Sequence, residues 1–177
     1  MKTSVFVGAS LDGFIARLDG NFDFLSGGGE ITLESNGFEP FFATVDAVLM
    51  GRNTYEVVLP FPTWFYGTKP VFVLSHRPIP PAPAGAIVEQ VSGPLAKVLS
   101  ELGARGLEHV YVDGGITIQS FLRAGLIDRM VVTRVPVLIG RGVPLFGEVD
   151  ADIALEHEVT RTLAGGAVQS EYWVRRS

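Results

Sequence analysis

Short apolar runs that end at a glycine or a polar turn constrain most strongly what this chain can fold into. Runs of three or four apolar residues without polar alternation are typical of strands that helices cover on both faces. The chain contains such runs at Val5–Val7, Ala47–Met50, Val71–Leu74 and Val110–Val112. We therefore expect four buried strands in the sheet of an α/β protein.

Helical patterns lie between these runs. Apolar residues recur at i, i+3, i+4 and i+7 over Leu95–Leu102, with Pro94 as a start signal and Gly103 as a stop. A shorter stripe over Ile118–Leu122 and the segment Phe38–Val45 predict further helices. This alternation of strands and helices favours parallel strand pairing.

The C-terminal third of the chain has a different pattern. Met130–Ile139 reads as a strand interrupted by Pro136. Leu155–Leu163 alternates apolar or basic residues with acids and threonines, Ala164–Gly166 supplies a turn, and Val168–Val174 completes a hairpin. The predicted fold class is therefore α/β, a mixed and mostly parallel sheet flanked by helices with a C-terminal antiparallel hairpin.

Length, charge and composition exclude several protein classes. The 177 residues suit one domain, 1–177, and the net charge of −5 argues against a broad nucleic-acid surface. The absence of cysteine excludes disulfides, thiolate catalysis and cysteine-ligated zinc, and the sequence predicts no metal site. No stretch approaches the roughly 20 apolar residues that span a bilayer, and the first run is too short for a signal peptide. We expect a cytoplasmic protein that does not bind membranes.

Two strand-to-helix turns have the residues of a phosphate site. Gly114 and Gly115 follow one apolar strand and precede a helix, whose first amides attract anions. Gly51 and Arg52 stand in the same place after another strand. A cation is usually disfavoured at a helix start, so a bound anion would explain Arg52. Both turns also have a plainer interpretation, as a tight Gly-Gly turn and a solvated arginine.

A third strand ends in polar residues that point to the same edge. Ser75, His76 and Arg77 follow Leu74, which places a hydroxyl and a basic group together. Ligands of open α/β sheets bind beyond the carboxyl ends of the strands. An ordinary polar turn is the alternative interpretation.

In this order, the segments resemble dihydrofolate reductase and its relatives, including the reductase domain of bacterial riboflavin-biosynthesis proteins. They are similar to the family's opening strand and nicotinamide loop, its adenosine-phosphate segment, the strand end beside the 2′-phosphate, the pyrophosphate turn with its helix, and a riboflavin-type segment. The matching stretches are Val5–Ala16, Leu49–Glu56, Val73–Pro78, Val112–Leu122 and Leu138–Phe146.

This resemblance implies a three-layer fold, NADPH as cofactor, and hydride transfer to a small heterocycle of the pterin or pyrimidine-dione type. The cofactor residues that it implies fall into four groups. They are Ala9, Ile15 and Ala16 for the nicotinamide; Gly51, Arg52, Asn53 and Thr54 for the adenosine half; Leu74, Ser75, His76 and Arg77 beside the 2′-phosphate; and Gly114, Gly115, Ile116 and Thr117 for the pyrophosphate.

The acid that fixes the pterin in folate reductases has no clear counterpart in this chain. Glu34 and Glu39 lie in the corresponding region, and Asp12 follows the first strand. Asp12 and Glu39 are the catalytic candidates, one to contact substrate or an ordered water and the other to bind ring nitrogens. Their alternatives are a turn-forming residue and an acid at a solvated helix start.

Aromatic side chains and histidines complete the candidate list. A flat substrate could lie against the aromatic residues, which serve equally as core or interface; we expect His109 and His157 to be surface or packing residues. The aromatic set is Phe41, Phe42, Trp64, Phe65 and Tyr66.

Two other functions stay open. Gly140–Phe146 favours the riboflavin-pathway 5-amino-6-(5-phosphoribosylamino)uracil reductase. The uncertain pterin acid favours a non-catalytic dimeric nucleotide-binding module. In each case we expect a small-molecule partner and a homodimer, with the late hairpin and Met130–Ile139 at its interface.

Overall fold

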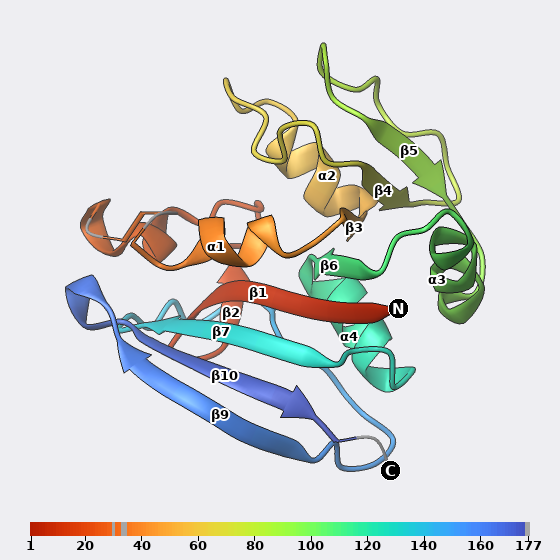
Figure 1. The fold of residues 1–177 in the computed structure, drawn as a ribbon. Coiled ribbons are helices and arrows are strands. Elements are labelled where there is room, and N and C mark those ends of the chain that lie inside the picture. The colour runs from red at the N-terminus through yellow and green to blue at the C-terminus, as the bar shows by residue number, and fades with distance from the viewer. Residues whose placement is uncertain (30, 33–34, 176–177) are drawn as a thin grey trace.

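The structure is a computed structural model, and it describes residues 1–29, 31–32 and 35–175. The described residues form an eight-stranded mixed sheet (Figure 1). Its first six strands in sheet order are parallel, and the last two form an antiparallel hairpin at the lower edge in Figure 1. The order is β5 (Val88–Val91), β4 (Val71–Leu74), β3 (Ala47–Gly51), β6 (His109–Asp113), β1 (Lys2–Ser10), β7 (Arg129–Val135), β10 (Val168–Val174) and β9 (Leu155–Thr162).

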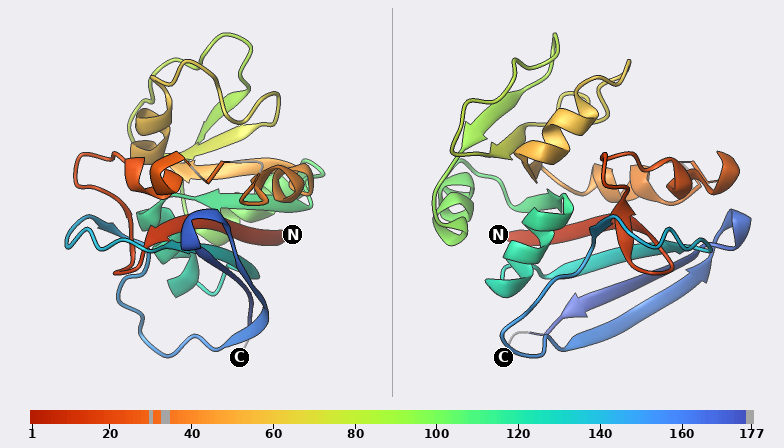
Figure 2. Two further views of the ribbon diagram at one scale, coloured as in Figure 1. Left: turned by 90° about the vertical axis from the view of Figure 1, so that its left-hand side faces the viewer. Right: turned by 180° about the vertical axis from the view of Figure 1, so that it is seen from behind.

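Helices cover both faces of the parallel part of the sheet (Figure 2). α1 (Phe38–Ala43) and α2 (Arg52–Val58) contribute buried residues to one core cluster, and α3 (Leu95–Ala104) and α4 (Gly115–Arg123) contribute to the other. The run in strand β3 is apolar throughout because successive side chains point to opposite faces of the sheet, and both faces are buried. The predicted three-layer α/β fold is confirmed.

Two predicted elements end earlier in the structure than expected, one of them because of a proline. The strand predicted over Met130–Ile139 ends at Val135, because Pro136 has no N–H to donate to the sheet. Val137 instead turns back and donates its N–H to the carbonyl of Val135 at 2.8 Å. The helix predicted over Phe38–Val45 ends at Ala43.

Short elements escaped prediction because they carry little pattern. β5 is an edge strand whose central residues, Glu89 and Gln90, are exposed. β2 (Phe14–Ala16) and β8 (Val143–Pro144) pair with each other in a separate two-stranded sheet. Single 3₁₀ segments occur at Asp23–Gly29 and Ala164–Gly166, the latter as the predicted hairpin turn.

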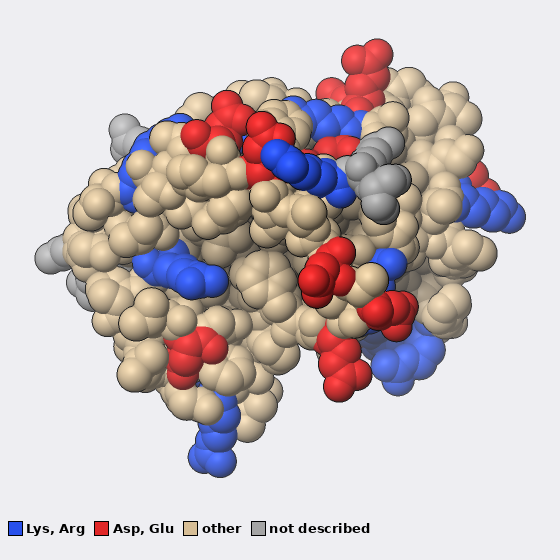
Figure 3. Space-filling view, turned by 90° about the horizontal axis from the view of Figure 1, so that it is seen from below, with Lys and Arg blue, Asp and Glu red and all other residues tan. Residues whose placement is uncertain are grey.

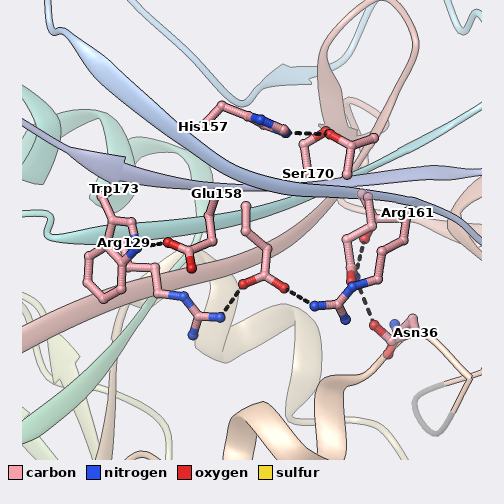
Figure 4. A network of polar contacts seen from close by, with 11 residues as sticks. Asn36, Arg129, His157, Glu158, Arg161, Ser170 and Trp173 are labelled. Carbon is pink, nitrogen blue, oxygen red and sulfur yellow. Dashed lines mark hydrogen bonds and ion pairs between the residues drawn. The ribbon is translucent and has the colours of Figure 1, made fainter.

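A buried carboxylate holds the hairpin to the parallel part of the sheet (Figure 4). Glu171 on β10 pairs with Arg129 on β7, and its second oxygen accepts from Arg161 on β9 at 2.8 Å. Its side chain is 10 % exposed. Further along β10, the amide of Gln169 donates to the carbonyl of Asn36 and the hydroxyl of Thr133, at 2.8 and 2.9 Å.

We expect Glu171→Ala to lower the free energy of unfolding by about 2 kcal/mol, since it leaves the partly buried Arg129 without its counter-ion. Glu156→Ala is the matched control. Glu156 lies on the same hairpin and pairs with Arg175 at 3.5 Å, but both side chains are more than half exposed, so at most about 1 kcal/mol should be lost. Urea unfolding monitored by circular dichroism measures both, and equal losses would contradict the assignment.

Candidate cofactor and substrate site

The parallel register brings three strand ends to one edge of the sheet. Gly51 at the end of β3 lies opposite Leu74 at the end of β4. On the other side of β3, Met50 lies opposite Asp113 at the end of β6. The predicted adenosine, 2′-phosphate and pyrophosphate segments therefore begin from adjacent strand ends, where open α/β sheets bind ligands.

The two predicted phosphate turns interlock through glycine and threonine. A Cβ on Gly114 would lie 2.2 Å from the Oγ1 of Thr54, and a Cβ on Gly51 would lie 2.7 Å from the Oγ1 of Thr117. Gly114 also has φ +92° and ψ 136°, a conformation that side chains strongly disfavour. Each threonine hydroxyl thus lies against the backbone of the opposite turn, and only glycine fits there.

Helix α4 begins in this cradle with free donors. The amides of its first turn, from Gly115, Ile116 and Thr117, have no acceptor within the helix. The preceding Gly114 offers no side-chain cap. Such a set of amides at the positive end of a helix is suited to an anion such as pyrophosphate.

The short β2–β8 sheet lies directly against this turn. From the place of a Cβ on Gly115, the Cδ1 of Ile15 and the Cγ1 of Val143 are both 3.1 Å away, and the carbonyl oxygen of Pro144 is 3.0 Å away. The predicted nicotinamide residue Ile15 and the pyrophosphate turn are therefore neighbours. Ala9, by contrast, is only 1 % exposed and belongs to the buried core.

The basic residues at this edge differ in how they are held. Arg52 donates from Nε to Glu56 at 2.6 Å, one turn along α2. Arg77 and His76 are exposed, and Arg77 makes no ion pair within the described part of the chain. The hydroxyl of Ser75 accepts from the Arg77 amide at 3.1 Å and fixes the turn. Arg52 is thus engaged within α2, whereas the Arg77 side chain has no acidic partner among the described residues.

A phosphate-bearing ligand would have to be attracted by charges close to its own site, since no broad basic surface is visible among the described residues of the face in Figure 3. On the face seen from below, acidic and basic side chains are interspersed and separated by uncharged areas (Figure 3).

In the described residues, no three His, Asp or Glu side chains gather as metal ligands, and no helix is long and apolar enough to cross a bilayer.

Asp113 is a candidate proton donor that the sequence analysis did not select. Its Oδ1 accepts the N–H of Gly114 at 2.8 Å, and its Oδ2 accepts the hydroxyl of Tyr66 at 3.2 Å. Burial raises the pKa of the Asp113 carboxyl above its ordinary value, although these hydrogen bonds oppose the shift. An acid directly after an apolar strand was the available signal, but the carboxyl's burial became visible only when Tyr66 was placed beside it.

The predicted catalytic acids have other surroundings than Asp113. The carboxylate of Asp12 accepts the amides of Ile139 and Gly140 at 3.3 and 2.7 Å. Glu39 is exposed in the first turn of α1. Glu34 lies outside the described residues. The catalytic roles of Asp12 and Glu39 stay predictions.

Most of the predicted aromatic wall is core. Phe41 and Tyr66 are buried in the cluster beneath α1 and α2, where Phe42 and Trp64 pack against them. Phe65 is 41 % exposed and contacts Phe61 edge-on.

The two histidines have structural surroundings. His109 is buried, with its ring nitrogens 2.8 Å from the Ser4 hydroxyl and 2.9 Å from the Thr44 carbonyl, and burial lowers its pKa. His157 is exposed on β9 and its Nε2 lies 2.7 Å from the hydroxyl of Thr160 (Figure 4). Both surroundings suit packing or surface residues.

The family model of the RibD C-terminal domain matches residues 2–168. The chain belongs to the RibD C-terminal domain family. Uncharacterized protein YwjB of Bacillus subtilis (strain 168) is 33% identical over 97% of this chain and 97% of its own length.

Solved structures show the same relationship. A putative riboflavin biosynthesis protein from Shewanella sp. PV-4 superposes with a TM-score of 0.89 and 39% identity, over 99% of this chain and 100% of that one. Dihydrofolate reductase from Enterococcus faecalis, complexed with NADP(H) and RAB-propyl, has a TM-score of 0.61 at 18% identity, over 99% of this chain and 97% of that one. At that identity it shows the fold alone. Together with the family match, these neighbours confirm the predicted resemblance to the dihydrofolate-reductase-like and RibD reductase families.

Proposed function

We propose that this RibD C-terminal domain protein is an NADPH-dependent reductase that transfers a hydride to a small heterocycle of the pterin or pyrimidine-dione type. The interlocked glycine turns carry the proposal. Gly51 and Gly114 are held where any Cβ would collide, beside the first turn of α4 and its free amides. The interlocking holds the start of α4 at the ends of β3 and β6, and the amides of a helix start can bind a pyrophosphate.

In this proposal each part of the cradle has a separate role. The amides of Gly115, Ile116 and Thr117 bind the pyrophosphate, and the exposed Arg77 binds the 2′-phosphate. Ile15 packs beside the nicotinamide half. NADPH supplies the hydride when it is bound, and the protein positions the substrate and supplies a proton.

Calorimetric titration with NADPH and NADH tests the cofactor assignment. We expect wild-type protein to prefer NADPH and Arg77→Ala to lose that preference, at a cost of about 1–3 kcal/mol for a charge-assisted contact. Arg52→Ala should cost less, because Glu56 already engages this guanidinium. Arg175→Ala, which follows the end of β10, is the control and should bind like wild type. Failure of wild-type protein to bind either nucleotide would overturn the proposal.

The specific alternative is the riboflavin-pathway 5-amino-6-(5-phosphoribosylamino)uracil reductase. The family match and the similar Shewanella protein, described as a putative riboflavin biosynthesis protein, favour it. Growth of a strain that lacks this reductase, when it expresses the protein, tests this function. No rescue despite good expression would exclude it, and NADPH binding without oxidation across pterins and pyrimidine-diones would favour a non-catalytic nucleotide-binding module.

We further propose that the protein works in the cytoplasm as a homodimer. The hairpin supports the dimer, since β9 is an edge strand with an exposed backbone edge in the described sheet. A monomeric mass in sedimentation at working concentration would refute the homodimer.

A further inference from the structure

The loops that follow β1 and β7 are joined to each other beyond the end of the sheet. Ser10 and Val135 are the last paired residues of these parallel strands. The next residue, Leu11, still donates its N–H to the carbonyl of Val137 at 2.8 Å. The loop that carries Asp12 therefore lies beside residues 137–142.

Asp12 fastens the two loops by its side chain. Its Oδ2 accepts the amide of Gly140 at 2.7 Å, and its Oδ1 accepts the amide of Ile139 at 3.3 Å. Gly140 has φ +75°, and this left-handed residue helps to aim successive amides at one anion. A hydrogen bond from Ser10, together with these amides, lowers the pKa of the Asp12 carboxyl, so it is ionised at neutral pH. Both oxygens are thus engaged with the protein.

Beyond this contact the loop leads directly into the wall of the candidate cofactor site. A Cβ on Gly142 would lie 2.2 Å from the carbonyl oxygen of Ala16, so the two backbones touch. Leu145 donates its N–H to the carbonyl of Gly13 at 2.9 Å. Between these contacts Val143 lies on Gly115, beside Ile15.

We propose that Asp12 is a positioning residue: it holds residues 137–142 against the β1–β2 loop and so keeps Ile15 and Val143 in place over the pyrophosphate turn. The effect of Asp12 on the position of residues 137–142 does not depend on a bound ligand. The effect on nucleotide binding rests on the proposed reductase function. Because both of its oxygens accept loop amides, Asp12 acts through the loop, and we expect its removal to lower cofactor affinity more than turnover.

Hydrogen exchange measured by mass spectrometry without nucleotide tests the first part. We expect Asp12→Ala to accelerate exchange at Ile139 and Gly140, and Asp12→Asn to give an intermediate rate because one oxygen can still accept. Asp19→Ala is the matched control. Asp19 also caps a turn, accepting the amide of Asn21 at 2.9 Å, but it does not join two loops. Unchanged exchange in Asp12→Ala would overturn the proposal.

NADPH titration and steady-state kinetics test the second part. Asp12→Ala should weaken NADPH binding by about tenfold, within the usual range for coupled sites, with kcat at saturating NADPH largely retained. Accelerated loop exchange with unchanged NADPH affinity would overturn the positioning role. A lost kcat with unchanged exchange and affinity would make Asp12 catalytic instead. If wild-type protein binds no NADPH, the reductase function fails, while the exchange result still decides whether Asp12 fastens the loops.

Discussion

Asp113→Asn is expected to lower kcat about 100-fold at neutral pH while leaving the folded protein at least as stable as wild type. Asp113 ends the central strand β6, opposite Met50 near the end of β3, and precedes the glycine turn. A proton donor for hydride transfer needs a pKa nearer neutrality than that of an ordinary aspartate. Burial moves the Asp113 pKa in that direction.

The stability of the variant follows from the direction of the same shift. The folded-state pKa lies above the ordinary value of 3.8, so between the two values the folded state binds more protons than the unfolded state. The free energy of unfolding therefore falls as the pH rises through that window, and above it the buried carboxylate is a net cost. Asparagine carries no charge, and its carbonyl can still accept the amide of Gly114. The stability gain of the variant should thus appear as the pH rises above about 4 and persist at neutral pH.

Asp46→Asn is the matched control for this experiment. Asp46 precedes the opposite end of β3, where its carboxylate accepts the amides of Glu108 and His109 at 2.8 Å. These hydrogen bonds lower the pKa of the Asp46 carboxyl, so its substitution should cost stability above the ordinary pKa and leave kcat unchanged. Urea unfolding between pH 4 and 8 measures the stability of both variants. NADPH oxidation, with a pterin or pyrimidine-dione that wild-type protein reduces as the hydride acceptor, measures their kcat. Unchanged kcat in Asp113→Asn would remove Asp113 as the proton donor.

The contrast between Asp12 and Asp113 shows what could be predicted from the sequence. Both acids come after an apolar run, and the local pattern gives Asp12 the more conspicuous setting, in a loop before glycine. The amides that engage Asp12 come from residues more than 120 positions away, and Tyr66, which buries Asp113, comes from the loop after α2. Local residue patterns do not encode such long-range neighbours, so the roles of individual acids could not be read from them.

The fold and the positions of the two glycine turns were predictable because their signals are local. Apolar runs that end at a glycine or a polar turn marked strands β3, β4 and β6, and the Leu95–Leu102 stripe marked α3. β2, β8 and β5 could not be found this way, since they are short and depend on partners elsewhere in the chain. The order of the glycine turns was therefore enough to predict the edge of the sheet that carries the candidate site, but not its walls.

The interlocking of the two turns leads to the second large expected effect. Gly114→Ala should lower the free energy of unfolding by about 3–5 kcal/mol, since it adds an unfavourable backbone conformation to a steric overlap. The new Cβ would meet the Oγ1 of Thr54 at 2.2 Å, and φ is +92°. Relief of this overlap moves the two turns apart, so NADPH binding should be lost together with stability.

Two further variants separate the steric and conformational contributions. Gly125 also has positive φ, +65°, but a Cβ there meets nothing within 4 Å, so Gly125→Ala reports the cost of a positive φ without steric overlap, about 1 kcal/mol. In Thr54→Ala/Gly114→Ala the colliding Oγ1 is absent and the nearest remaining atom, the Cβ of residue 54, is 3.3 Å away. The double variant should therefore recover the steric part of the loss, with an interaction energy of about 1–2 kcal/mol in a double-mutant cycle. If Thr54→Ala restores nothing, the hydroxyl does not lock the turns, and the cost of Gly114→Ala belongs to its backbone conformation.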